Sequence, residues 1–107
     1  MSAYLYLAQL AVPAGLETEF TRLYDEGYVP NLLAVPGVSS ANRYKLEWSD
    51  TPDMPEYLAV YEVETPEVPK SAAWKQASID CGWADTIRPH LITRRHGLFR
   101  KLSPTDS

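Results

Sequence analysis

The sequence has little cysteine and no long hydrophobic run. Its single cysteine, Cys81, cannot form a disulfide within the chain, which favours a reducing compartment. No apolar segment approaches the roughly 20 residues that a membrane-spanning helix needs, and the first residues lack the basic and apolar regions of a signal peptide. We therefore expect a cytoplasmic protein that does not enter a membrane.

Metal-binding clusters, phosphate-cradling glycine loops and an excess of basic residues are also missing. The two histidines, His90 and His96, have no cysteine or acid around them at a known metal-ligand spacing. Haem would need an axial ligand, and only these two histidines offer one. The net charge of -4 and the pI of about 5.0 argue against nucleic-acid binding. We expect no metal, no cofactor and no nucleic-acid partner.

The chain contains alternating strand and helix patterns that together are enough for one domain. Its 107 residues, 45% of them hydrophobic, suit a single domain over 1–107 with a polar tail at 103–107. The patterns predict strands at 3–12, 38–48, 56–64 and 92–102. Between them lie helical patterns over 16–28 and from residue 65 to a stop at Gly82. The order is therefore β-α-β-β-α-β, the ferredoxin-like arrangement of the α+β class.

Prolines modify both predicted helices. Gly27 weakens the end of the first helix and Pro30 bars its simple continuation, so we expect only one further turn, over 31–35. Thr65 and Pro66 form a good start for the second helix, but Pro69 delays the regular helix by a turn.

The first and third predicted strands are apolar on both alternating faces. In the first strand, Tyr4, Tyr6 and Leu10 lie on one face, and Leu5 and Leu7 lie on the other. A four-stranded antiparallel sheet with two helices on one face leaves its other face uncovered, and a large exposed apolar face marks an interface or a ligand site. We expect a second copy of the chain to pack on that face as a homodimer, unless the tyrosines only fill a core.

Four stretches resemble a known superfamily. Residues 23–38, LYDEGYVPNLLAVPGV, are similar to the first helix and turn of the dimeric α/β-barrel superfamily, in particular its EthD-like and stress-responsive A/B-barrel members. Residues 40–44, 57–63 and 95–99 are similar to later strands. The resemblance implies a ferredoxin-like fold that pairs into a dimeric α/β barrel. It leaves the activity open, because members include cofactor-free monooxygenases, haem-degrading enzymes, and decarboxylating and cyclising enzymes.

One departure from the resemblance concerns the chemistry. EthD-like chains often carry a glutamate-histidine pair where this sequence has Gly27 and Tyr28. A phenol donates a hydrogen bond, but its pKa of about 10 makes it a poor general base at neutral pH.

Three residues are candidates for catalysis: His90, His96 and Tyr28. His90 precedes the last strand, where it is either a proton-transfer group or a surface loop residue. His96 shares one alternating set with Arg94 and Arg100, and it points into the space between two sheets or is paired at a dimer interface. Tyr28 takes the place of the motif histidine.

Four residues are candidates for substrate binding: Tyr6, Arg43, Tyr61 and Trp83. The tyrosines, with Tyr28, supply hydroxyls to an aromatic ligand or simply pack. Arg43 binds a carboxylate or enolate oxygen, or pairs with Glu62 across the hairpin. Trp83, like Trp74, walls a pocket or locks a helix onto the sheet.

Two functions fit these patterns. The first is a cofactor-independent enzyme for a small apolar aromatic or ketonic metabolite, by oxygenation, cyclisation or decarboxylation. The second is a non-catalytic dimeric protein that binds such a ligand or serves as an accessory protein.

Overall fold

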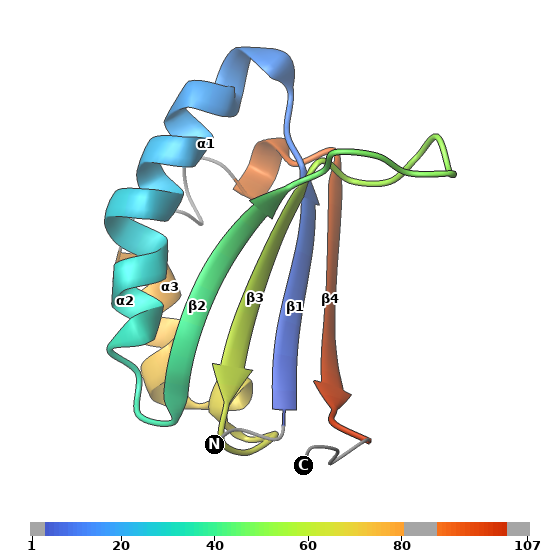
Figure 1. The fold of residues 1–107 in the computed structure, drawn as a ribbon. Helices are drawn as coiled ribbons and strands as arrows, with labels where there is room; N and C mark the ends of the chain where they lie inside the picture. The colour runs from blue at the N-terminus through green and yellow to red at the C-terminus, as the bar shows by residue number, and fades with distance from the viewer. Residues whose placement is uncertain (1–3, 81–87, 103–107) are drawn as a thin grey trace.

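The computed structural model describes residues 4–80 and 88–102. Its sheet has the order β2-β3-β1-β4 with antiparallel neighbours, and the helices lie on one side of it (Figure 1). The strands are β1 (Tyr4–Ala11), β2 (Val38–Lys45), β3 (Tyr57–Val63) and β4 (Thr93–Arg100); the α-helices are α1 (Glu17–Leu23), α2 (Val29–Leu33) and α3 (Ala72–Asp80). The 3-10 turns are η1 (Ala14–Leu16), η3 (Val68–Lys70) and η4 (Arg88–His90). The predicted ferredoxin-like order and antiparallel sheet are confirmed.

The first helix continues past Pro30, contrary to the prediction. A π-helical turn, η2 (Tyr24–Tyr28), joins α1 to α2, and the Val29 N–H bonds to the Tyr24 carbonyl. A π turn takes up one extra residue within a helix. Pro30 then falls in the first turn of α2, where a missing N–H and a fixed φ are tolerated. Tyr24 and Tyr28 both face the core as a result.

Pro69 delays the second helix as predicted. It lies in η3, and α3 begins only at Ala72. The Ser71 hydroxyl accepts a hydrogen bond from the Trp74 N–H at 3.2 Å and donates one to the Val68 carbonyl at 2.8 Å. This serine capping of the helix start fixes Trp74 over the sheet.

Strand β2 ends at Lys45, three residues earlier than predicted. Beyond it Leu46 still donates a backbone hydrogen bond to Glu56 at 2.7 Å. The connection over residues 46–56, called the arm below, then projects away from the helices (Figure 1). Trp48 on the arm is 79% exposed.

The two faces of the sheet differ in how they are covered. Tyr61 and Ala59 on β3 pair with Tyr6 and Ala8 on β1, and this set faces the helices. The opposite set is called the bare face. Its apolar side chains, Leu5, Leu7, Leu58, Val60 and Phe99, are exposed or only partly buried, and Gln9, Asn42, Tyr44, Glu62 and Arg95 lie on the same face. The prediction that the first strand is apolar on both faces is confirmed, but within one chain only one face is covered.

Gly37 ends the turn before β2 and allows a stability test. Its φ is +94°, and a Cβ there would lie 2.6 Å from Val68 Cγ2. Because this φ disfavours L side chains, we expect Gly37→Ala to lower the free energy of unfolding by about 2 kcal/mol or more. Urea unfolding measures the change. The control is Gly15→Ala, whose Cβ would meet nothing within 4 Å; an equal loss in both variants would contradict the account.

Candidate functional site

Six side chains, called the aromatic layer, belong to a continuous group of rings between the sheet and the helices that also includes Phe20 and Tyr57. The ring of Tyr6 lies 5.2 Å from Trp74 and 5.7 Å from His96, between ring centroids. Trp74 also meets Tyr61 edge to face at 5.4 Å. Edge-to-face and stacked contacts of this kind add stability beyond the area they bury. The members of the layer are Tyr6, Tyr24, Tyr28, Tyr61, Trp74 and His96.

Two phenol groups meet at the buried end of the layer. The Tyr61 hydroxyl donates a hydrogen bond to the Tyr24 hydroxyl at 3.2 Å, and both side chains are 1% exposed. Burial raises the pKa of each phenol far above its ordinary value, and the nearby Tyr28 adds to both rises. Tyr24 further raises the pKa of Tyr61, whereas the hydrogen bond from Tyr61 offsets part of the rise in the pKa of Tyr24. Both groups therefore stay protonated at neutral pH and act as hydrogen-bonding groups, not as bases.

The other end of the layer is open. His96 lies on the edge strand β4 opposite the buried Ala8, so it is on the helix side of the sheet. The register thus differs from the predicted orientation of His96 into a space between two sheets, because it sends Arg95 and Gly97 to the bare face instead. A hollow of about 180 Å³ on that face is nevertheless bordered by both Arg95 and His96. His96 stacks on Tyr6 with an angle of 23° between the rings and remains exposed to solvent.

Arg43 lies beside the layer and has a different partner from the predicted one. Its guanidinium lies 5.0 Å from the centre of the Tyr24 ring and pairs with Asp25 at 2.6 Å. The predicted pairing with Glu62 is wrong, because Glu62 faces the opposite side of the sheet and accepts a hydrogen bond from Ser40. The cation thus packs over aromatic rings and holds the π turn against β2.

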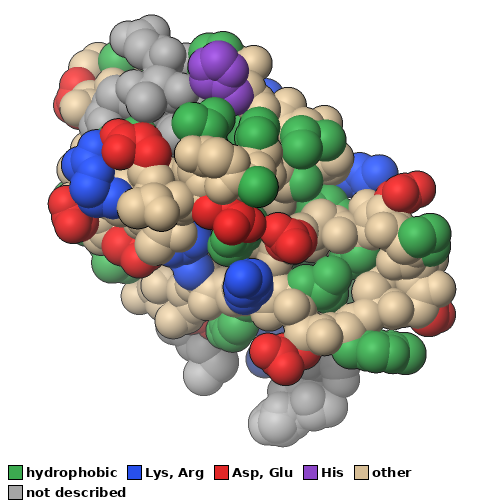
Figure 2. All heavy atoms as spheres, turned by 90° about the horizontal axis from the view of Figure 1, so that it is seen from above, with side chains coloured by type: hydrophobic (Ala, Val, Ile, Leu, Met, Phe, Trp, Pro, Cys, Tyr) green, Lys and Arg blue, Asp and Glu red, His purple; other side chains and the backbone are tan. Residues whose placement is uncertain are grey.

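The remaining candidates do not join this group. His90 lies exposed on η4. Figure 2, the view from above, shows hydrophobic, acidic and basic side chains interspersed over the surface. No ring contact or hydrogen bond within the described residues ties His90 to the aromatic layer. Trp83 lies outside the described residues.

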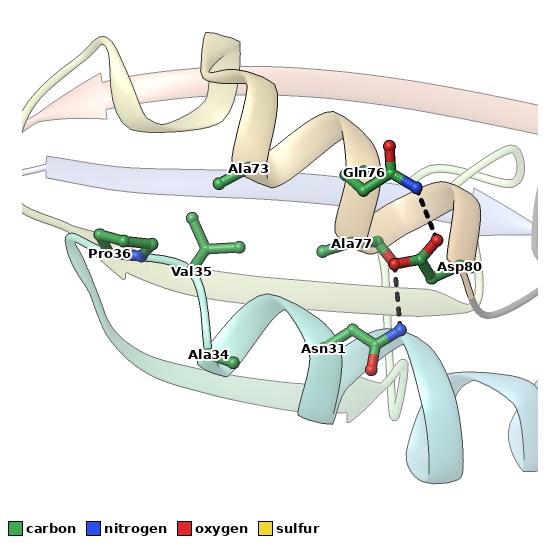
Figure 3. Close-up of a pocket in the computed structure, with 8 residues that line it drawn as sticks. All are labelled: Asn31, Ala34, Val35, Pro36, Ala73, Gln76, Ala77 and Asp80. Atoms are coloured by element: carbon green, nitrogen blue, oxygen red, sulfur yellow. Dashed lines mark hydrogen bonds between the residues drawn. The ribbon is translucent and has the colours of Figure 1, made fainter.

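Two open hollows lie away from the aromatic layer. Figure 3 shows a cleft of about 380 Å³ between α2 and α3, in which Asn31 donates a hydrogen bond to the Ala77 carbonyl at 3.1 Å and Gln76 bonds to Asp80. Its polar groups thus bond to one another across an apolar floor. A groove of about 450 Å³ runs on the bare face at the base of the arm, beside Gln9, Tyr44, Trp48, Met54 and Leu58.

Sequence reasoning missed Tyr24 as a polar member of the site. Its spacing with Phe20 and Tyr28 showed only that it faces the core. The π turn decides that Tyr24 meets a phenol 37 residues away. The spacing of Tyr24 and Tyr28, four residues apart, was the one available signal.

Neither a metal centre nor a membrane helix is found in the described part of the chain. Over residues 4–80 and 88–102, no three His, Cys, Asp or Glu side chains gather to hold an ion. In the same ranges, every helix is too short or too polar to cross a membrane.

Solved structures share this fold, although no protein-family model and no curated protein matches the chain. An EthD family protein from Bacillus halodurans superposes with a TM-score of 0.70 at 12% identity, covering 95% of this chain and 100% of that one. The haem degrader MhuD of Mycobacterium tuberculosis, solved with two haems in its active site, gives 0.64 at 16% identity, with 94% and 96% covered.

A third neighbour is SnoaB, a cofactor-independent oxygenase from Streptomyces nogalater. It gives a TM-score of 0.60 at 20% identity and covers 94% of this chain and 96% of its own. At these identities the likeness establishes the fold. The chain therefore shares the ferredoxin-like fold of these solved structures.

The raised pKa values of Tyr24 and Tyr61 predict an alkaline loss of stability. Because the folded chain holds these protons more tightly than the unfolded chain, whose phenols titrate near pH 10, the stabilisation is complete below that pH and is lost as pH rises above it. The expected slope is about 1.4 kcal/mol per pH unit for each buried phenol.

Urea unfolding between pH 8 and pH 11.5 tests this. Tyr61→Phe should flatten the alkaline fall, whereas Tyr44→Phe should not, because Tyr44 is 53% exposed. Equal slopes in the unmodified chain and both variants would show that the Tyr24–Tyr61 pair does not govern the alkaline stability.

Proposed function

We propose that the protein is a cofactor-independent enzyme that acts on a small, flat aromatic or ketonic molecule at the open end of the aromatic layer. The observation that carries the proposal is the stacking of the exposed His96 on Tyr6. It joins a flat apolar surface to a group whose ordinary pKa of about 6.5 suits proton transfer. Shared fold with SnoaB, a cofactor-independent oxygenase, and with the haem degrader MhuD supports an enzyme of this size and shape.

The residues of the aromatic layer have different roles in the proposed reaction. His96 takes or gives a proton, since it is the exposed member of the layer and an imidazole has an ordinary pKa near neutrality. The ring of Tyr6 holds the substrate. We assign no contact with a developing oxyanion to Tyr28 or Tyr61, because both are buried and the Tyr61 hydroxyl already donates to Tyr24. We assign no proton transfer to His90, because it lies on η4 outside the layer.

The working unit of this proposal is a homodimer in the cytoplasm. The bare face exposes Leu5, Phe99 and Tyr44 at 38%, 55% and 53%, and a patch of this kind marks an interface. A second copy is the occupant to which we commit. A two-fold axis brings two identical apolar faces together, and the groove at the base of each arm offers room for the partner's exposed side chains.

One observation favours a second function, that of a binding protein without catalysis. Tyr28 replaces the motif histidine and is 7% exposed, and burial keeps Tyr24 and Tyr61 protonated. The buried part of the layer thus contains no general base, and only His96 separates the two functions.

Two probes test the enzyme proposal: 1-naphthol, a flat phenol, and 1-tetralone, a flat aromatic ketone. Either should raise the melting temperature by mass action and quench Trp74 fluorescence. Turnover is followed by oxygen uptake and by chromatography. His96→Gln should lower turnover by about a hundredfold or more, beyond any loss of binding, whereas His90→Gln should change neither turnover nor binding.

Each outcome separates the candidates. Binding without turnover in the unmodified chain would reject the enzyme and support the binding protein. Absence of both binding and turnover would reject the two together.

A charge on the bare face tests the homodimer. Leu7 lies at its centre, opposite Val60 and Gly97, so Leu7→Lys should convert the dimer to a monomer because a buried, unpaired ammonium is costly. Leu33→Lys is the control, since Leu33 lies on α2 and is already 44% exposed. Light scattering after size exclusion reads the mass. A Leu7→Lys protein that stays dimeric would show that the two copies meet elsewhere.

A further inference from the structure

The helix-side face of β4 carries a row of exposed side chains next to the aromatic layer. Arg94, His96, Leu98 and Arg100 lie opposite Leu10, Ala8, Tyr6 and Tyr4 of β1. Directly opposed residues of an antiparallel pair share one face, so this row lies on the same side as the layer. Leu10 and Ala8 are buried, yet all four residues of the row are exposed. The helices therefore leave this edge of the site open.

The row is cationic in an acidic protein. Residues 93–102, TRRHGLFRKL, contain four Lys or Arg and no acid, although the whole chain carries a net charge of -4. Within the described residues, the ion pairs belong to Arg22 and Arg43, and Arg94 and Arg100 form none. These two guanidinium groups are therefore exposed cations without an acidic partner among residues 4–80 and 88–102.

The spacing fits one small molecule. Alternate residues of a strand are about 6.8 Å apart, so Arg94 is one such step from His96 and Arg100 two steps in the other direction. A ring lying against Tyr6 and His96 brings a substituent within reach of the long Arg94 side chain. An arginine side chain binds a carboxylate through two parallel N–H hydrogen bonds.

We infer that the ligand of this site is an aromatic acid, whose ring stacks on Tyr6 and His96 and whose carboxylate is held by Arg94, with Arg100 attracting it from the other side. The inference rests on the proposed function and narrows its substrate class from apolar aromatic molecules to anionic ones. A single strand edge on a protein of net negative charge does not suit a polyanion such as nucleic acid.

The chain contains its own matched control. Arg95 has the same charge and the same strand as Arg94, and it is also exposed, but it lies opposite Gln9 on the bare face. Arg94→Gln and Arg95→Gln therefore change the net charge equally and differ only in the face of the sheet from which the charge is removed.

The experiment compares 1-naphthoate with its uncharged methyl ester, by calorimetry and Trp fluorescence at 50 mM and 500 mM NaCl. We expect the acid to bind the unmodified chain at least tenfold more tightly than the ester, with an affinity that falls at high salt. Arg94→Gln should weaken binding of the acid by about tenfold, and Arg100→Gln should weaken it by less. Neither Arg94→Gln nor Arg100→Gln should change the affinity for the ester. Arg95→Gln should not change the affinity for either ligand.

The outcomes distinguish this inference from the proposed function. If the ester binds as tightly as the acid, the aromatic site stands and the carboxylate inference is overturned. Equal losses in Arg94→Gln and Arg95→Gln would mean general attraction of an anion to a basic strand, which also overturns it. If neither compound binds, the site itself is rejected.

Discussion

The structure depends on one constraint: β1 lies inside the sheet and carries large apolar side chains on both faces. On the helix side, Ala8 and Leu10 are buried and Tyr6 is partly buried. On the other side, Leu5 is exposed and Leu7 is only partly buried. Because burial of apolar surface is favourable, the same strand that builds the core also leaves an apolar face on which the proposed homodimer rests.

The aromatic layer shows how stability limits the chemistry. Each ring of this size removes about 150–250 Å² from water, and the Tyr24–Tyr61 hydrogen bond satisfies both hydroxyls in the core. The burial that stabilises these phenols also raises their pKa and withdraws them from acid-base work. In the proposed function, proton transfer and charge recognition therefore belong to the edge strand β4, where His96, Arg94 and Arg100 are exposed.

The sequence predicted the fold better than the site. Alternation and helical spacing were enough to predict the order of strands and helices along the chain, because each pattern is local and repeats along its element. The π turn at Tyr24–Tyr28 was not predictable from Gly27 and Pro30 alone, since it is stabilised by packing against β2 and β3.

Register explains the other errors. Both alternating sets of β4 mix apolar with charged residues, so the face on which His96 lies is fixed only by pairing with Ala8. Arg43 meets Asp25 only because η2 passes over β2. Tyr6, Tyr28 and Tyr61 were predicted as one group, and the structure does place all three in the aromatic layer, with Tyr24 linking them.

Hydroxyl-radical footprinting of the unmodified chain at low and high concentration tests the division of the sheet most directly. Oxidation of each peptide, read by mass spectrometry, reports the exposure of its side chains. We predict that Tyr24 and Tyr61 stay unreactive throughout, while Tyr44 and Phe99 on the bare face lose reactivity as the concentration rises. Reactivity of Tyr44 and Phe99 that does not change with concentration would contradict the account.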